Sequence, residues 1–83
     1  MQIVWDDFKR RKNLAKHGMD FAELDIAFFA EAVVTRSRER RFVAVGVYQA
    51  ETAIAVVFHS LGGEAISIIS MRRASRKERK LLA

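Results

Sequence analysis

The chain has 83 residues and is 51% hydrophobic, which is enough for one small domain, residues 1–83, with a compact core. Its 15 Lys and Arg exceed its 10 Asp and Glu, and the net charge of +5 points to an anionic partner: nucleic acid, an acidic protein or a membrane surface. The absence of cysteine excludes disulfides and thiolate metal sites, and two histidines are too few for the usual zinc sites. Carboxylate sites for magnesium stay open in principle, but we expect neither a metal nor another cofactor. No apolar run approaches the ~20 residues of a bilayer span, so we expect a cytoplasmic protein with no membrane partner.

The N-terminal segment predicts a short strand followed by a helix. Gln2 to Trp5 is β-prone, and Asp7 to His17 has the charge pattern of a thin amphipathic helix. Gly18 is well placed as the left-handed residue that ends this helix. The expected apolar anchors of the helix are Phe8, Leu14 and Ala15.

A second helix is predicted from Asp20 onward, because Asp20 and Glu23 have the spacing of a capping box. Apolar residues then recur at helical intervals, at Phe21, Leu24, Ala27 and Phe28. This pattern is typical of a helix that faces the core rather than of a cofactor site.

The second half of the chain changes to the two-residue period of strands. Strands are expected at 33–35, 41–48, 52–59 and from Ile66 to the arginines at 72 and 73, with a two-residue turn at Gly62-Gly63. Ser75 and Glu78 then have capping-box spacing, which predicts a short C-terminal helix. The expected fold is α+β: two N-terminal helices packed on an antiparallel four-stranded sheet, with the first strand either separate or added at an edge.

The cations fall into three groups, at Lys9 to Lys16, Arg36 to Arg41 and Arg72 to Lys80. Two interpretations remain open from the residues alone. The groups converge on one surface that binds a phosphate backbone, or each is only the solvated side of its own element.

RNA cleavage without a metal requires a proton acceptor, a proton donor and cations that hold the charge on phosphorus. His17 is the first candidate for proton transfer and Glu78 the second, although a helix-terminal role for His17 and a capping role for Glu78 are also compatible with their positions. His59 is a weaker candidate, because it falls at the end of a strand near a glycine turn. Arg41, Arg72 and Lys16 are the candidates for holding phosphate. The expected RNA contacts are Lys9, Lys12, Arg73, Arg76 and Arg79.

An ordered set of motifs runs through the chain: IVWDDFKRRKNLAKHGMDFAELD at the start, VAVGVY in the middle and AISIISMRRASRKERK at the end. Together they resemble the BrnT family of type II toxins from Ile3 to Lys80. The resemblance implies a RelE-like fold and a ribonuclease that inhibits translation until an antitoxin with a ribbon-helix-helix DNA-binding domain neutralises it. The residues that match the family motifs are Lys9, Asn13, Lys16, His17, Gly18, Ile69, Ser70, Arg72, Ala74, Glu78 and Arg79.

Three positions depart from the family pattern. Ser67 stands where the closing strand usually carries an arginine, the last helix ends in Leu81-Leu82-Ala83 without an aromatic residue, and the acidic-Gly segment is reduced to Arg38-Glu39-Arg40. Loss of one arginine from a phosphate site removes about 1.5–3 kcal/mol of charge-assisted hydrogen bonding, which puts full activity in question. The leading hypothesis is a metal-independent endoribonuclease toxin. The alternative is a non-catalytic basic module that docks an acidic protein or nucleic acid.

Overall fold

The computed structural model describes residues 1–83 and has α+β architecture. In chain order the elements are β1 (Gln2–Trp5), α1 (Asp7–His17), the 3₁₀ turn η1 (Phe21–Glu23), α2 (Ile26–Glu31), β2 (Val33–Arg36), β3 (Arg41–Tyr48), β4 (Thr52–Ser60), β5 (Ala65–Arg73), α3 (Arg76–Arg79) and the 3₁₀ turn η2 (Lys80–Leu82). None of the helices is long and apolar enough to cross a membrane.

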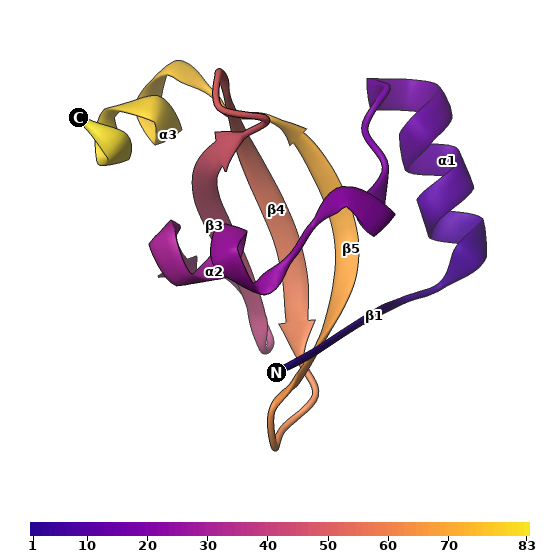
Figure 1. The fold of residues 1–83 in the computed structure, drawn as a ribbon. Helices are drawn as coiled ribbons and strands as arrows, with labels where there is room; N and C mark the ends of the chain where they lie inside the picture. The colour runs from indigo at the N-terminus through magenta and orange to yellow at the C-terminus, as the bar shows by residue number, and fades with distance from the viewer.

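The sheet has five strands in the order β1-β5-β4-β3-β2 (Figure 1). Strands β2 to β5 form the expected antiparallel meander, and β1 adds at an edge, as one of the two alternatives allowed. It pairs with β5 in parallel, however, so the sheet is a mixed sheet of five strands and not a purely antiparallel sheet of four. Ile3 and Trp5 of β1 align with Ile66 and Ile68 of β5, and all four contribute to one apolar layer. Nothing local to β1 specifies this pairing, because its partner lies some sixty residues away in the chain.

The predicted second helix is divided into η1 and α2. Asp20 accepts a hydrogen bond from Ala22 N at the start of η1, and Asp25 accepts one from Phe28 N (2.9 Å) at the start of α2. Two successive N-caps therefore replace the single helix expected, since each cap requires an extended residue where the helix would have to continue. Glu23 does not complete a capping box; its carboxylate accepts from the Tyr48 hydroxyl instead.

The core lies between one face of the sheet and the layer formed by η1 and α2, while α1 lies along the edge of β5. Its buried members are Met19, Phe21, Leu24, Ala44, Ile54, Val56, Phe58, Ile66, Ile68 and Met71. On the opposite face a smaller cluster of Val45, Ala55 and Ala74 is covered by Leu82 of η2. The remainder of that second face has no helix over it, and we call it the open face.

Helix α1 keeps its predicted bounds, and Gly18 ends it with φ of +71°. Its expected apolar anchors were wrong, because Phe8 is 64% exposed and Leu14 is 40% exposed. The buried residue of the helix is Asn13, which donates to Met19 O (3.2 Å) and accepts from Met71 N (3.1 Å). Strand β1 pairs with β5 only as far as Ile68, and the amide of Met71 beyond that point is satisfied by α1.

The hairpin between β4 and β5 differs slightly from expectation at its turn. Gly62 and Gly63 both have positive φ, as predicted, but the connection from β4 to β5 is a four-residue loop, Leu61 to Glu64.

The capping box at Ser75 is confirmed, with Glu78 N donating to Ser75 Oγ (3.1 Å) and Ser75 N donating to the Glu78 carboxylate (2.8 Å).

Candidate nucleic-acid interface

The open face presents three cross-strand rows of side chains on β3, β4 and β5. Residues directly opposite one another in a sheet project from the same face, so the register fixes which side chains are neighbours. The rows are Arg41, His59 and Ser67; Val43, Val57 and Ser70; and Val45, Ala55 and Arg72. The first two rows are solvent-accessible, whereas Val45 and Ala55 are buried beneath the C-terminal segment. The open face is therefore a shallow apolar strip with polar groups at both ends.

Arg41 and His59 form a hydrogen-bonded pair at one end of this strip. Arg41 Nε donates to His59 Nε2 at 3.2 Å. In this contact the guanidinium is the donor and His59 Nε2 is the acceptor. His59 lies between Arg41 and Ser67 in its row, and this pairing brings a cation and an imidazole together on an accessible surface.

Arg72 and Glu78 form a second pair at the other end of the strip. The guanidinium donates from both terminal nitrogens to the two carboxylate oxygens, at 2.7 and 3.1 Å. This ion pair, followed by the capping bond from Ser75 N, lowers the pKa of Glu78 to about 2. The same hydrogen bond raises the pKa of Arg72. Glu78 is thus ionised at neutral pH and fixes Arg72 against the start of α3.

The lysines of α1 lie along one flank of the helix. They are Lys9, Lys12 and Lys16. Asn13 faces β5 and Arg10 forms a bidentate ion pair with Asp20 (2.7 and 2.8 Å), which fixes the rotation of the helix. At 3.6 residues per turn, Asn13 lies between two flanks of the helix. The three lysines occupy one flank, and Arg10 and His17 occupy the other. Since Asp20 leads into η1 over the covered face, the lysine flank borders the open face.

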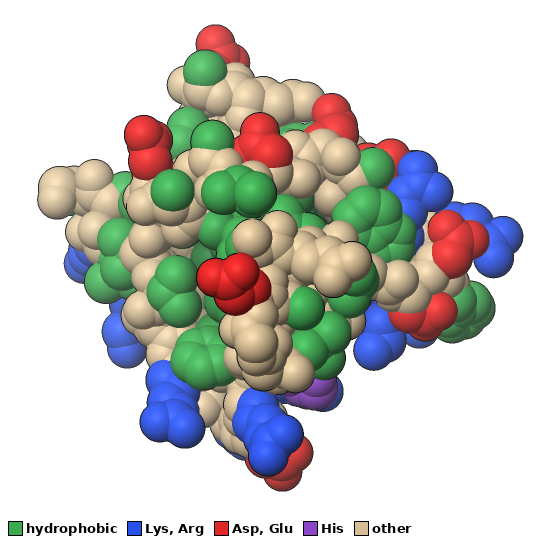
Figure 2. All heavy atoms as spheres, turned by 60° about the horizontal axis from the view of Figure 1, so that its bottom comes forward, with side chains coloured by type: hydrophobic (Ala, Val, Ile, Leu, Met, Phe, Trp, Pro, Cys, Tyr) green, Lys and Arg blue, Asp and Glu red, His purple; other side chains and the backbone are tan.

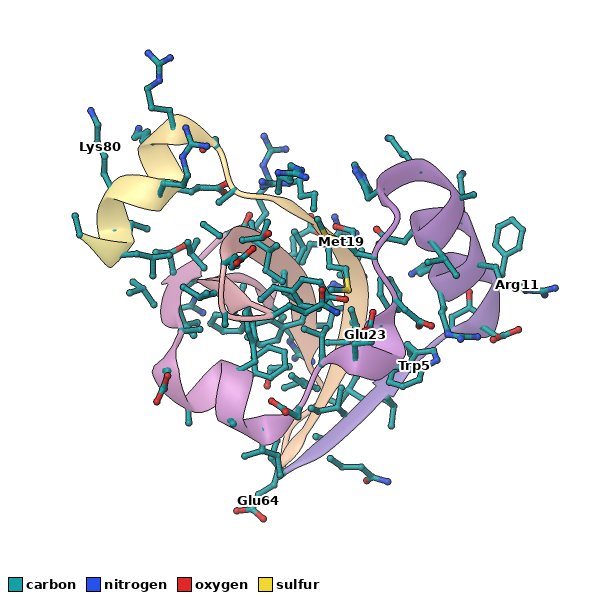
Figure 3. All side chains as sticks on the ribbon, turned by 45° about the horizontal axis from the view of Figure 1, so that its top comes forward. Trp5, Arg11, Met19, Glu23, Glu64 and Lys80 are labelled. Carbon is teal, nitrogen blue, oxygen red and sulfur yellow. The ribbon has the colours of Figure 1, made fainter.

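The three cationic groups border the open face but do not gather at one point. Figures 1 and 3 both show α1 and α3 on opposite sides of the molecule, and in Figure 3 the side chains of Arg11 and Lys80 point away from each other. Arg41 aligns with Ser67 through β4, whereas Arg72 lies five residues further along β5. At about 3.3 Å per residue this separates the two ends by roughly 16 Å, or a few nucleotides of RNA backbone.

The sequence-predicted residues therefore divide into three places. Arg41 is at one end of the open face, and Arg72 and Glu78 are paired at the other end. Lys16 is on the lysine flank of α1, and His17 is the last residue of that helix, on its opposite flank. The remaining expected RNA contacts on α1 and α3, and Arg73, are exposed. The pairing of His59 with Arg41 was missed, although the lengths of β3 and β4 and their short turn contain enough information to place the two residues opposite each other.

Comparisons with known proteins agree with this architecture. Residues 5–78 match the family described as the ribonuclease toxin, BrnT, of type II toxin-antitoxin systems. The fold is similar to the 1.1 Å crystal structure of the Brucella abortus ribonuclease toxin BrnT, with a TM-score of 0.86 and 47% identity, covering 92% of this chain and 99% of that chain. A search of curated proteins gave no match. Because both the family match and the structural match span nearly the whole sequence, the chain belongs to the BrnT family of ribonuclease toxins of type II toxin-antitoxin systems.

Proposed function

We propose that this chain is a metal-independent endoribonuclease that binds RNA across the open face, inhibits translation by cleaving RNA, and is neutralised by its antitoxin. The observation that carries the proposal is the Arg41–His59 pair, which places a cation beside an imidazole on an accessible surface bordered by further cations. These are the two kinds of group that metal-free cleavage of RNA needs at the reacting phosphate.

Arg41 binds the scissile phosphate in this proposal, and the binding activates its partner. When the guanidinium turns to a phosphate oxygen, it releases His59 Nε2, which then accepts the proton of the 2′-hydroxyl. The attack of that oxygen on phosphorus breaks the bond to the 5′-oxygen, which takes up a proton. Lys16 and His17 end α1 beyond Asn13, which binds Met71 N next to Arg72, so Lys16 is placed to hold a phosphate at the Arg72 end of the face. His17 lies on the other flank of α1 at that same end, and the leaving oxygen at Arg41 therefore takes its proton from water.

Arg72 and Glu78 have a different proposed role. A carboxyl with a pKa of about 2 is not protonated near neutral pH, so Glu78 positions Arg72 rather than transferring a proton. Arg72 keeps donors free for a phosphate further along the RNA, since the two bonds to Glu78 use only part of its five N–H groups. Lys9, Lys12, Arg73, Arg76 and Arg79 extend the phosphate contacts beyond both ends.

Ser67 favours the alternative of a weakened or non-catalytic binding module, because it offers a hydroxyl where an arginine was expected. Arg41 lies in the same cross-strand row, however, so a cation is retained at this end of the face.

Family membership implies a cognate antitoxin. We propose that this antitoxin covers the basic surface and contacts DNA through a ribbon-helix-helix domain.

The test is incubation of the purified chain with a defined RNA, with and without EDTA, beside three alanine variants. Cleavage is expected to survive EDTA, to fall strongly in Arg41→Ala and His59→Ala, and to fall less in Arg72→Ala. Arg11→Ala is the matched control, because the Arg11 side chain is 71% exposed and pairs with Asp7 on the outer side of α1. Cleavage that needs a divalent metal, or that is unchanged in both Arg41→Ala and His59→Ala, would overturn the proposed mechanism. RNA binding without cleavage would support the binding module.

A further inference from the structure

Charge is distributed very unevenly along this chain. Residues 18–35 contain four acidic side chains and no Lys or Arg, a net charge of −4, whereas the remaining residues carry 15 cations and six acids, a net charge of +9. The acidic segment comprises η1 and α2, the layer that covers the sheet on the side away from the open face. A protein with a net charge of +5 thus has one distinctly acidic region.

This acidic region contains a groove of about 370 Å³ between α2 and the turn that joins β3 to β4. Its lining combines apolar and acidic side chains, namely Glu23, Leu24, Asp25, Ala27, Phe28, Glu31, Val47, Tyr48 and Gln49. Figure 2 shows one side of the molecule on which hydrophobic surface is interspersed with acidic side chains, while the cations are displaced to its margins. The lining includes no Lys or Arg.

The three carboxylates of the groove have no cationic partner within the chain. All ion pairs of the protein involve other acids, at Asp7, Asp20 and Glu78. Glu23 accepts hydrogen bonds from the Tyr48 hydroxyl and from Gln49 Nε2 (2.9 Å), which fixes one wall of the groove. Burial, followed by the hydrogen bond to Glu23, raises the pKa of Tyr48 to about 12, so the phenol stays a neutral donor.

The apolar part of the groove is also left uncovered. Among the apolar residues of α2 that line the groove, Ala27 is exposed and Phe28 is half-buried. Apolar side chains held open beside unpaired carboxylates match a ligand that is itself both apolar and cationic.

We propose that this groove binds a cationic amphipathic segment of the cognate antitoxin, with its apolar side chains on Ala27 and Phe28 and its Lys or Arg side chains against Glu23 and Glu31. RNA is disfavoured here, because the carboxylates repel phosphate. The inference rests on the proposed neutralisation by an antitoxin. The inference adds that part of the antitoxin is anchored away from the RNA-binding face. An antitoxin segment bound to the RNA-binding face itself would have to be acidic.

The experiment compares Glu31→Lys with Glu64→Lys, two substitutions that change the net charge equally. The Glu31 side chain makes no hydrogen bond or ion pair in the fold, while Glu64 is exposed in the loop between β4 and β5, at the other end of the sheet from the Tyr48 turn (Figure 3). The cognate antitoxin is titrated by calorimetry into each purified variant, and cleavage of a defined RNA by the free proteins is measured in parallel. Glu31→Lys is expected to weaken antitoxin binding by at least about tenfold, and Glu64→Lys by less than about twofold.

Glu31→Gln removes the charge with the least change of shape and is expected to weaken binding by an intermediate factor. Equal antitoxin affinity in both lysine variants, with normal circular dichroism, would overturn the inference. A second result would also overturn it. If the wild-type protein were a dimer by sedimentation, and Glu31→Lys alone abolished the dimer without changing antitoxin affinity, the groove would bind a second copy of the chain instead. Absence of RNA cleavage from all proteins would count against the proposed ribonuclease function alone, since the binding comparison does not depend on it.

Discussion

The open face and the groove beside α2 lie on opposite sides of the same sheet and carry charge of opposite sign. The open face has Arg41 and Arg72 at its ends and the α1 lysines along its border, and its apolar strip is flat. The groove has three carboxylates around a hollow and belongs to the acidic segment of residues 18–35. The difference shows that a net charge of +5 is a poor description of this surface, because it averages two regions suited to different partners.

The polar groups of the two regions are also held in different ways. On the basic side, Arg41, Arg72 and α1 are fixed by hydrogen bonds to other side chains or to strand backbone. On the acidic side, Asp25 is committed to the cap of α2 and Glu31 has no partner. Glu23 is held by Tyr48 and Gln49, so Glu31 is the groove carboxylate that can adjust to a protein segment, whereas preorganised cations suit a substrate of fixed charge spacing. Four substitutions or conditions separate these contributions.

Asn13→Ala is expected to have the largest effect, because Asn13 attaches the lysine-bearing helix to β5. The change leaves the buried Met71 amide and Met19 carbonyl without their side-chain partner, and the free energy of unfolding should fall by about 2–4 kcal/mol. Urea unfolding followed by circular dichroism measures it. The adjacent Lys12→Ala, at an exposed position, should unfold like the unchanged protein. Equal stability of the two variants would show that α1 is attached in some other way.

Gly46→Ala acts on the acidic side. A β-carbon at this position would lie 2.7 Å from Phe28 Cε1, so the ring and α2 must shift and the groove must change shape. We expect a loss of about 1–3 kcal/mol in unfolding free energy together with weaker antitoxin binding, but unchanged RNA cleavage by the folded protein. Adding Phe28→Leu to the variant should recover much of the stability by making room. No recovery in the double variant would argue against the packing explanation.

Acidification should act on the basic side through Glu78. Its pKa falls from 4.5 to about 2 on folding, so the stabilisation is complete above pH 4.5 and is lost as the pH falls toward 2. Because Arg72 and Glu78 are partly exposed, we expect this contribution to be about 1–3 kcal/mol. Glu78→Gln should flatten that part of the stability curve between pH 5 and pH 2, as measured by thermal unfolding. Glu64→Gln should leave the curve intact; matching curves for both variants would contradict the role of the ion pair.

Lys16→Ala should have the smallest effect, and the effect should be visible mainly in the salt dependence of RNA binding. If Lys16 neutralises one phosphate, the slope of log affinity against log salt for RNA should decrease in magnitude by about one, with little change of stability. Fluorescence anisotropy with labelled RNA over a range of salt concentrations measures the slope. An unchanged slope for Lys16→Ala, equal to that of Arg11→Ala, would remove Lys16 from the RNA-binding surface.

Much of the fold could be predicted because its signals are local. The bounds of α1 and β3, the left-handed Gly18 and the capping box at Ser75 all follow from side chains within a few residues of one another. The division of the second helix was missed although Asp25 is a good N-cap residue, because the apolar spacing continues across it. The parallel addition of β1 was not predictable, since its partner strand is specified only by the folded core.

The candidate site shows the same distinction between features set by neighbours in the chain and features set by the folded core. The sequence by itself determined which residue types are available for binding phosphate, and its ordered motifs identified the toxin family. Only the tertiary structure decided that Arg41 pairs with His59, that Arg72 is bound to Glu78, and that Asn13 rather than an apolar residue anchors α1. The physical reason is that capping and periodicity depend on neighbours in the chain, whereas these contacts depend on strand register and on which face of the sheet each helix covers.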